Sequence, residues 1–254
     1  MTDASQPTTP VVVVTGASGG IGAAIARRLG TDGYRLVLAA RREDALRQVA
    51  DAATAAGAGG AVVVPTDVTR RDDVLRLRDA ALDAFGAFDV WINNAGRGIT
   101  RSVLDLADDD VDEMITVNVK SALYGMQAAV PHFVERGTGH LVNVSSTLGR
   151  VPIAPFRSAY SASKAALDSL TINLRMDLAA HPGIHVSLLR PGVVTSDFAR
   201  NVRGEPRPPI TGIGPQPQSP EAVADVLARL LREPAPERYT NPASERLARE
   251  LLCG

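Results

Sequence analysis

Short runs of apolar residues alternate along the chain with longer segments in which apolar and polar residues recur at helical spacing. The first run, VVVVT at 11–15, has no polar alternation, which is typical of a strand buried on both faces of a sheet. The segment after Gly22 has the spacing of a helix that ends near Gly30. The same order then repeats, with apolar runs at 34–40, 61–65, 88–92, 140–145 and 184–190 and helical patterns at 43–56, 71–84, 108–134, 158–179 and 220–232.

This strand–helix order predicts one fold class. Strict alternation is typical of a doubly wound parallel sheet with right-handed crossovers, so we expect a Rossmann-type, three-layer α/β/α sandwich. No linker or internal repeat interrupts it, which favours a single domain over 1–254 with a flexible N-terminus at 1–10. A weak strand at 238–240 and a leucine-bearing helix at 243–252 fall in an atypical C-terminal tail, 233–254.

Composition narrows the possible partners. The net charge is −1 and charged residues make up 22% of the chain, so neither nucleic acid nor an anionic membrane is expected as a partner. The single cysteine, Cys253, can form no internal disulfide, and no apolar run approaches the ~18 residues of a membrane span. The segment 1–10 lacks the basic start and apolar core of a signal peptide. We therefore expect a cytoplasmic protein without a membrane span.

The histidines predict no metal site. None of the four lies in a cluster with acidic residues or with Cys253, and each occupies a helix end, a strand start or a turn, where a structural role is the simpler interpretation. The four are His132, His140, His181 and His185.

A glycine-rich turn follows the first strand and opens a helix, which is the context that makes such a motif informative. In TGASGGIG, Gly16 can form the tight turn, Gly20 lets a pyrophosphate approach the backbone and Gly22 lets helix and strand pack closely. The helix N-terminus offers N–H groups and a positive dipole end to phosphates, and Ser18 adds a hydroxyl. We predict a dinucleotide site here, with Ile21 as a further contact.

The end of the second strand selects between two cofactors. A carboxylate there would bind the adenosine ribose and repel a 2′-phosphate, but the chain has Ala40, then Arg41 and Arg42. The sequence therefore predicts NADP(H), with Arg41 as the main phosphate contact and Arg42 beside it. Two solvated arginines that leave NAD(H) acceptable are the alternative.

Tyr160 and Lys164 stand four residues apart, on one face of a predicted helix. Lys164 is one of only two lysines in the chain, the other being Lys120. Because the phenol has an ordinary pKa of about 10, acid–base work near neutral pH needs a lowered value, which a nearby cation provides. A surface Tyr and Lys without function is the alternative.

Taken together, these motifs resemble the short-chain dehydrogenase/reductase family from about residue 11 to residue 232. The resemblance rests on TGASGGIG, NNAG at 93–96, the Ser-Tyr-Lys set and PGVVTSD at 191–197, in that order. It implies a single Rossmann domain of seven parallel strands, a homodimer or homotetramer, and hydride transfer between a nicotinamide and a carbonyl or alcohol carbon.

The resemblance also implies a catalytic set. Tyr160 would be the general acid or base, and Lys164 would lower its pKa and bind the nicotinamide ribose. Ser146 would bond the substrate oxygen, although Ser145 competes for that role. Asn118 would kink the long helix and hold a proton-relaying water, unless it is an ordinary polar position in the helix.

Further cofactor contacts follow from the same resemblance. Asp67, with Val68 beside it, resembles the contact to the adenine, and Thr195 the contact to the nicotinamide carboxamide, although both could be simple turn residues. Asn93 is expected to bond only between strands. The remaining contacts implied are Asn94, Ala95, Gly96, Pro191, Gly192 and Val193.

Two segments depart from the family pattern. The stretch between Ser146 and Tyr160 is one residue longer than usual and contains Pro152 and Pro155, which points to a distinctive substrate pocket. The C-terminal end lacks the family's common Asp-Gly-Gly ending after a seventh strand and has ERYTNPASERLARELL instead. Apart from these departures, the Pro- and Gly-rich segment 198–220 is expected to be a substrate-binding lid, with a flexible surface loop as the alternative.

These inferences predict an NADP(H)-dependent oxidoreductase acting on a small-molecule carbonyl or secondary alcohol. A non-catalytic NADP(H)-binding regulator on the same fold is the alternative. Arginines near the predicted pocket favour an acidic or acyl-carrier substrate, whereas Val151, Ile153 and Phe156 favour a lipophilic ketone, and the sequence does not choose between them.

Overall fold

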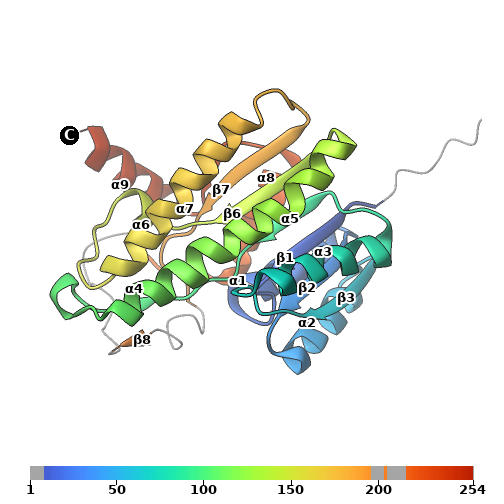
Figure 1. The fold of residues 1–254 in the computed structure, drawn as a ribbon, viewed down its shortest axis with the longest axis horizontal. Coiled ribbons are helices and arrows are strands. Elements are labelled where there is room, and N and C mark those ends of the chain that lie inside the picture. The colour runs from blue at the N-terminus through green and yellow to red at the C-terminus, as the bar shows by residue number, and fades with distance from the viewer. Residues whose placement is uncertain (1–8, 196–202, 205–215, 254) are drawn as a thin grey trace, which may run out of the picture.

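A parallel β-sheet runs through the centre of the molecule (Figure 1). The computed structural model describes residues 9–195, 203–204 and 216–253. Within these residues the main sheet has seven strands in the order β3-β2-β1-β4-β6-β7-β9, so the order reverses between β1 and β4. The strands are β1 (Val11–Thr15), β2 (Arg35–Ala40), β3 (Gly60–Pro65), β4 (Val90–Asn93), β6 (Gly139–Val144), β7 (Ile184–Arg190) and β9 (Glu237–Tyr239). This arrangement confirms the predicted doubly wound α/β fold.

Helices cover both faces of this sheet because its strands are apolar on both sides. Val12 and Val14 pack into one hydrophobic cluster and Val11 and Val13 into another, as the alternation of side chains along a strand requires. One cluster contains α1 (Gly20–Thr31), α2 (Glu43–Ala55) and α8 (Pro220–Arg232). The other contains α3 (Arg71–Phe85), α5 (Ser121–Arg136) and α7 (Ser158–Asp177).

The single helix predicted over 108–134 is three successive elements. These are α4 (Asp108–Ile115), one stretch of π-helix, η2 (Thr116–Lys120), and α5. Asn118 lies within η2, where the kink was expected. A π-helical stretch has no distinct hydrophobic period, so the sequence pattern could not separate it from the α-helices on either side.

A small second sheet lies beside α4, and the sequence did not predict it. β5 (Ile99–Thr100) pairs in parallel with β8 (Arg203–Gly204). Strands of two residues are too short to show a period. Arg203 also forms ion pairs with Asp110 Oδ1 (2.9 Å) and Glu113 Oε2 (2.8 Å) of α4. The short helix η1 (Val103–Asp105) follows β5.

The C-terminal tail packs against the rest of the chain. The weak strand predicted at 238–240 is β9, which extends the main sheet beside β7. The terminal helix α9 (Pro242–Cys253) lies next to α6 (Thr147–Arg150), as Figure 1 shows. Buried Ser244 of α9 approaches Gly192 so closely that a Cβ on that glycine would be 2.6 Å from Ser244 Oγ.

Two predicted segments fall largely outside the described residues. Of the predicted flexible terminus, 1–10, the structure describes only residues 9 and 10, and of the predicted lid, 198–220, only 203–204 and 216–220. In the part of the chain that is described, no helix is long and apolar enough to cross a membrane.

Candidate active site

The glycine-rich turn joins β1 to α1 at the carboxyl edge of the sheet. Gly16 has a φ of 67° and Gly20 a φ of 54°, in the left-handed region that favours glycine. Gly22 faces the Gly16 carbonyl and the Asn94 amide with no room for a Cβ atom. The first turn of α1 has no side-chain cap and no acidic residue, so its N–H groups remain available to an anion. Ser18 and Ile21 lie in the same turn.

Arg42 is the cation that reaches this turn. Its Nη2 donates hydrogen bonds to Ser18 O (3.2 Å) and Ser18 Oγ (3.3 Å). Arg41 is also exposed at the end of β2, but it is the neighbouring position. Of the two arginines predicted for this site, Arg42 is thus the one with hydrogen bonds to the glycine-rich turn.

The motif NNAG ties the end of β4 to the end of β1. Asn94 Nδ2 donates to Thr15 O (2.9 Å) and Gly16 O (3.2 Å). Thr15 Oγ1 in turn accepts the backbone N–H groups of Asn94 (3.0 Å) and Ala95 (3.2 Å). The structure thus brings Asn94, Ala95 and Gly96 beside the glycine-rich turn, at the point where strand order reverses.

Asn93 has a structural role. Its Oδ1 accepts a hydrogen bond from Trp91 Nε1 (2.8 Å), and its Nδ2 donates to Asn143 Oδ1 (2.9 Å) and Ala122 O (3.2 Å). Asn93 is buried, and these bonds link β4 to β6 and to α5. Bonding between strands was the expected role.

Lys164 is buried and reaches across the carboxyl end of β6. Its Nζ donates to Val144 O (2.8 Å) and lies 5.8 Å from the centroid of the Tyr160 ring. A Cβ atom on Gly96 would be 3.6 Å from the same Nζ. The predicted tyrosine–lysine pair therefore lies next to the NNAG motif.

The Asn118 side chain links η2 to the backbone of Arg97, which follows NNAG in the loop between β4 and β5. Its Oδ1 accepts the Arg97 N–H (2.8 Å), and its Nδ2 donates to Arg97 O (2.9 Å) and Ser163 Oγ (3.0 Å). The side chain is buried. It therefore holds the backbone at Arg97 against α7.

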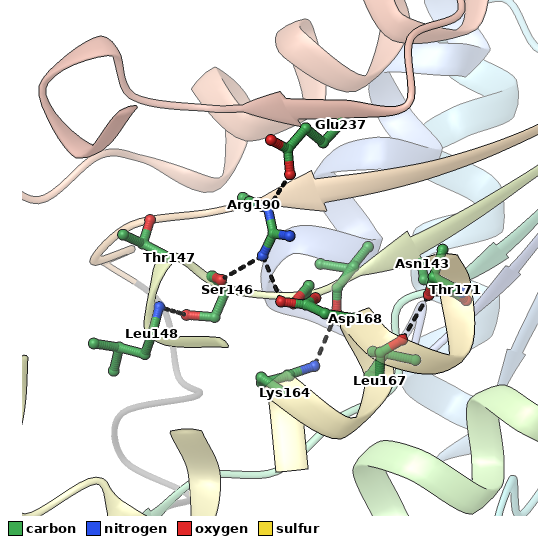
Figure 2. A network of polar contacts seen from close by, with 12 residues as sticks. Asn143, Ser146, Thr147, Leu148, Lys164, Leu167, Asp168, Thr171, Arg190 and Glu237 are labelled. Atoms are coloured by element: carbon green, nitrogen blue, oxygen red, sulfur yellow. Dashed lines mark hydrogen bonds and ion pairs between the residues drawn. The ribbon is translucent and has the colours of Figure 1, made fainter. Parts of the chain in front are cut away.

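The two adjacent serines point to different partners. Ser145 Oγ donates to Asp168 Oδ1 (2.5 Å), which lies on α7. Ser146 Oγ accepts the Leu148 N–H (3.1 Å) and forms a hydrogen bond with Tyr160 (Figure 2 shows the Leu148 bond). The geometry agrees with the assignment of Ser146, rather than Ser145, to the catalytic role.

Asp67 forms a turn of its own. Its Oδ1 accepts the Thr69 N–H (3.0 Å) and Thr69 Oγ1–H (2.7 Å), an arrangement typical of Asx turns. Val68 is partly buried against the cluster that contains α3. The turn role that was the alternative for Asp67 is thus present, and it leaves the other carboxylate oxygen for a ligand.

Pro191 to Thr195 follow β7 at the same edge of the sheet. Val193 O accepts the Gln218 N–H (2.9 Å), and Gln218 O accepts the Thr195 N–H (2.9 Å) and Thr195 Oγ1–H (3.2 Å). Thr195 is exposed, and Pro191 and Gly192 precede this paired segment. The segment therefore borders the site formed by the glycine-rich turn and Lys164.

A family model described as short chain dehydrogenase matches residues 10–207. The chain belongs to the short-chain dehydrogenase family. An uncharacterized oxidoreductase of Staphylococcus aureus is 40% identical over 187 residues, which cover 74% of this chain and 79% of the relative.

Solved structures of short-chain dehydrogenases have the same fold. One from Burkholderia phymatum, in complex with NAD, is 31% identical, has a TM-score of 0.83 and covers 95% of this chain and 92% of its own. An alcohol dehydrogenase from the archaeon Thermococcus sibiricus, complexed with 5-hydroxy-NADP, is 29% identical, has a TM-score of 0.79 and covers 91% and 95%.

The electrostatics of this short-chain dehydrogenase differ from the expectation for its tyrosine. Burial raises the pKa of Tyr160 above its ordinary value, and the charge of Asp168 adds to that rise. The Ser146 hydrogen bond and the Arg157 charge act in the opposite direction. The pKa of Tyr160 is therefore raised overall, because loss of hydration outweighs the Ser146 hydrogen bond and the Arg157 charge.

Burial also changes the pKa of Lys164. Loss of hydration lowers the pKa of Lys164 to about 8, although the Asp168 charge partly opposes this effect. An ammonium that titrates near pH 8 remains mostly protonated at neutral pH.

A charge network around the buried Arg190, which the sequence did not predict, lies next to these residues. Arg190 Nη1 pairs with Asp168 Oδ2 (2.6 Å), and Arg190 Nε pairs with Glu237 Oε2 (2.8 Å), as Figure 2 shows. Two signals were present in the sequence. Asp168 follows Lys164 by four residues on the inward face of a helix, and Arg190 ends an apolar strand.

Metal ligands do not gather at the site. Within the residues that the structure describes, no group of three or more His, Cys, Asp or Glu side chains is placed to hold a metal ion. His140 instead bonds Ser187 Oγ (2.8 Å) through Nε2, and His132 Nε2 accepts the Phe88 N–H (3.3 Å).

Proposed function

We propose that this short-chain dehydrogenase is an NADP(H)-dependent oxidoreductase that acts on a small-molecule carbonyl or secondary alcohol. The observation that carries the proposal is the placement of Ser146, Tyr160 and Lys164 at the carboxyl edge of the sheet, beside the glycine-rich turn. Such an edge, at the reversal of strand order, is where ligands of doubly wound sheets bind.

The residues present fit a nicotinamide dinucleotide. The turn has no room for a Cβ on Gly22, and the N–H groups at the start of α1 are not capped by a side chain, so the pyrophosphate has a backbone cradle. Relatives with the same fold bind NAD in one case and an NADP derivative in another. Arg42, beside Ser18, supports NADP(H) over NAD(H) because it adds a positive charge near the adenosine ribose.

When bound, the nicotinamide supplies or accepts the hydride. The protein's own residues manage the proton and the charge on the oxygen. Ser146 and Tyr160 donate hydrogen bonds to the carbonyl oxygen and stabilise the negative charge that develops there. As the carbonyl is reduced, Tyr160 gives its phenolic proton to that oxygen, and in the reverse direction it takes the proton from the alcohol. Because burial raises the pKa of Tyr160, the phenol is protonated at neutral pH, which suits reduction.

A carbonyl panel tests the proposal directly. The purified protein is mixed with NADPH and aldehydes, ketones and keto acids, and the loss of NADPH absorbance is followed. We expect turnover of at least one carbonyl, loss of at least about 10³-fold in kcat for Tyr160→Phe, and an NADPH Kd within about threefold of the wild type. NADPH binding without turnover on any carbonyl would instead favour a non-catalytic regulator.

A further inference from the structure

Arg190 and Asp168 form an ion pair in the interior of the protein. Their side chains are 1% and 8% exposed, and Nη1 lies 2.6 Å from Oδ2. Such pairs give little net stability, because the loss of hydration offsets the attraction, and apolar residues of similar volume often serve as well. Stability alone therefore does not account for this pair.

The pair lies against both serines at the end of β6. Asp168 Oδ1 accepts the Ser145 hydroxyl (2.5 Å). Figure 2 shows the second contact, in which Arg190 Nη1 lies 3.5 Å from Ser146 O. The two charged groups thus contact consecutive residues, Ser145 and Ser146, which follow β6 and which we call the Ser146 corner.

The pair also joins three other segments of the site. Asp168 lies on α7, one turn beyond Lys164, and Arg190 immediately precedes Pro191 in the segment that borders the cofactor site. Glu237 of β9 contacts the far side of the Arg190 guanidinium. A single network therefore connects the ends of β6 and β7, the catalytic helix and the last strand of the sheet.

Few other charges act on the tyrosine. These are Arg157, which immediately precedes α7, and Asp168 on α7, and β7 contributes Arg190 behind Asp168. On α4, which packs against α7, Asp110 pairs with Arg101 and Arg203, and Glu113 pairs with Arg97 and Arg203. Asp168 is thus the carboxylate that acts on both Tyr160 and Lys164.

We propose that Asp168 and Arg190 are positioning residues for the hydride-transfer reaction. Together they hold the Ser146 corner, the Lys164 helix and the Pro191 segment in register, and the arginine balances the carboxylate so that Tyr160 keeps its working protonation state. This inference rests on the proposed oxidoreductase function.

Opposite shifts in pH dependence test the inference. Reduction needs a protonated Tyr160, so kcat/KM falls as pH rises through the pKa of that residue. Asp168→Asn removes a negative charge, and we expect the fall to move to lower pH by about 1 unit. Arg190→Met leaves the carboxylate unbalanced and should move the fall to higher pH by about 1 unit. The double variant should lie within about 0.3 unit of the wild type, because both charges are gone.

A matched control uses a pair outside the site. Arg136 Nη1 and Asp89 Oδ1 lie 3.0 Å apart near the surface, and Arg136→Met should leave the pH profile unchanged. If Asp168→Asn and Arg190→Met lower kcat and Tm but leave the pH profile at its wild-type position, the pair is structural only and the inference is overturned.

Folding failure does not prevent the test. Asp168→Glu keeps the negative charge but moves it by one methylene, and Arg190→Lys keeps the positive charge but replaces the planar guanidinium with an ammonium. For each variant we expect at least a tenfold lower kcat, an unshifted pH profile and an unchanged NADPH Kd. Wild-type kcat in both would overturn the positioning role. If Tyr160→Phe retains full turnover, the proposed function fails, and that result is separate from the outcomes for Asp168 and Arg190.

Discussion

Gly125 of α5 lies directly against the side-chain amide of Asn93, with no room for a methyl group between them. The same amide holds β4 to β6 through Asn143 and accepts the indole N–H of Trp91. A close approach between helix and sheet is therefore built around one glycine and one buried asparagine.

Gly125→Ala is expected to destabilise the fold by about 2–3 kcal/mol, although alanine is the better helix former by about 1 kcal/mol. The added methyl group must displace the Asn93 amide and break its hydrogen bonds. Urea unfolding measures the change in the free energy of unfolding. A variant that is as stable as the wild type, or more stable, would show that α5 can move away from β4 without cost.

Lys164→Met is expected to abolish turnover and to stabilise the protein without cofactor by about 1–3 kcal/mol at pH 7. The pKa of Lys164 is lowered to about 8, so the buried ammonium costs free energy at neutral pH. The unfolded chain binds this proton more tightly than the folded chain, and wild-type stability from this group therefore rises between about pH 8 and pH 10.5.

The difference in the free energy of unfolding between Lys164→Met and the wild type should consequently shrink as pH rises. Urea unfolding of the wild type and Lys164→Met at pH 7 and pH 9.5 measures it. An advantage for the methionine variant that is the same at both pH values would argue against a buried, titrating lysine.

Arg42→Ala is expected to weaken NADPH binding by about tenfold to a hundredfold and to leave NADH binding within about threefold of the wild type. Arg42 contacts Ser18 in the glycine-rich turn, and a 2′-phosphate placed there would gain a charge-assisted hydrogen bond. Arg41→Ala is the matched control and should have the smaller effect. Fluorescence titration of both cofactors gives the Kd values, and a larger loss in Arg41→Ala would restore the prediction made from the sequence.

Arg157→Gln is expected to move the alkaline fall of kcat/KM for reduction to higher pH by about 0.5–1 unit. The Arg157 charge lowers the pKa of Tyr160, so its removal leaves the phenol protonated over a wider range. Arg157→Lys keeps the charge and should retain the wild-type profile. The profile is measured from pH 7 to about pH 11.5, which covers a pKa raised above the ordinary value of about 10. A shift to lower pH in the glutamine variant would contradict the electrostatic interpretation.

The sequence predicted the sheet well because most of its strands are uninterrupted apolar runs. β9 is a weaker case, since a three-residue edge strand with one aromatic side chain has almost no pattern, and its place beside β7 is set by tertiary contacts such as Arg190 with Glu237. The π-helical stretch around Asn118 and the β5–β8 pair could not be predicted either, because these short elements have no recognisable pattern of apolar and polar residues.

For the site, motif spacing was sufficient to find the residues but not their surroundings. The turn glycines, NNAG and the Tyr160–Lys164 pair come together at one edge of the sheet as expected. The direction of the pKa shift at Tyr160 could not be predicted, because it depends on how much water burial removes. Asp168 and Arg190 were missed since they lie on different elements and their pairing exists only in the folded chain.

The seventh strand has a consequence for synthesis on the ribosome. Residues 11–190 contain six strands of the main sheet and both Asp168 and Arg190, whereas Glu237 follows 47 residues after Arg190. Until that last segment emerges, β7 is an open sheet edge and the Arg190 guanidinium lacks one of its two carboxylate partners. The arrangement of Asp168, Arg190 and Glu237 is therefore complete only after β9 has been synthesised, and products that end before β9 should aggregate and lack activity.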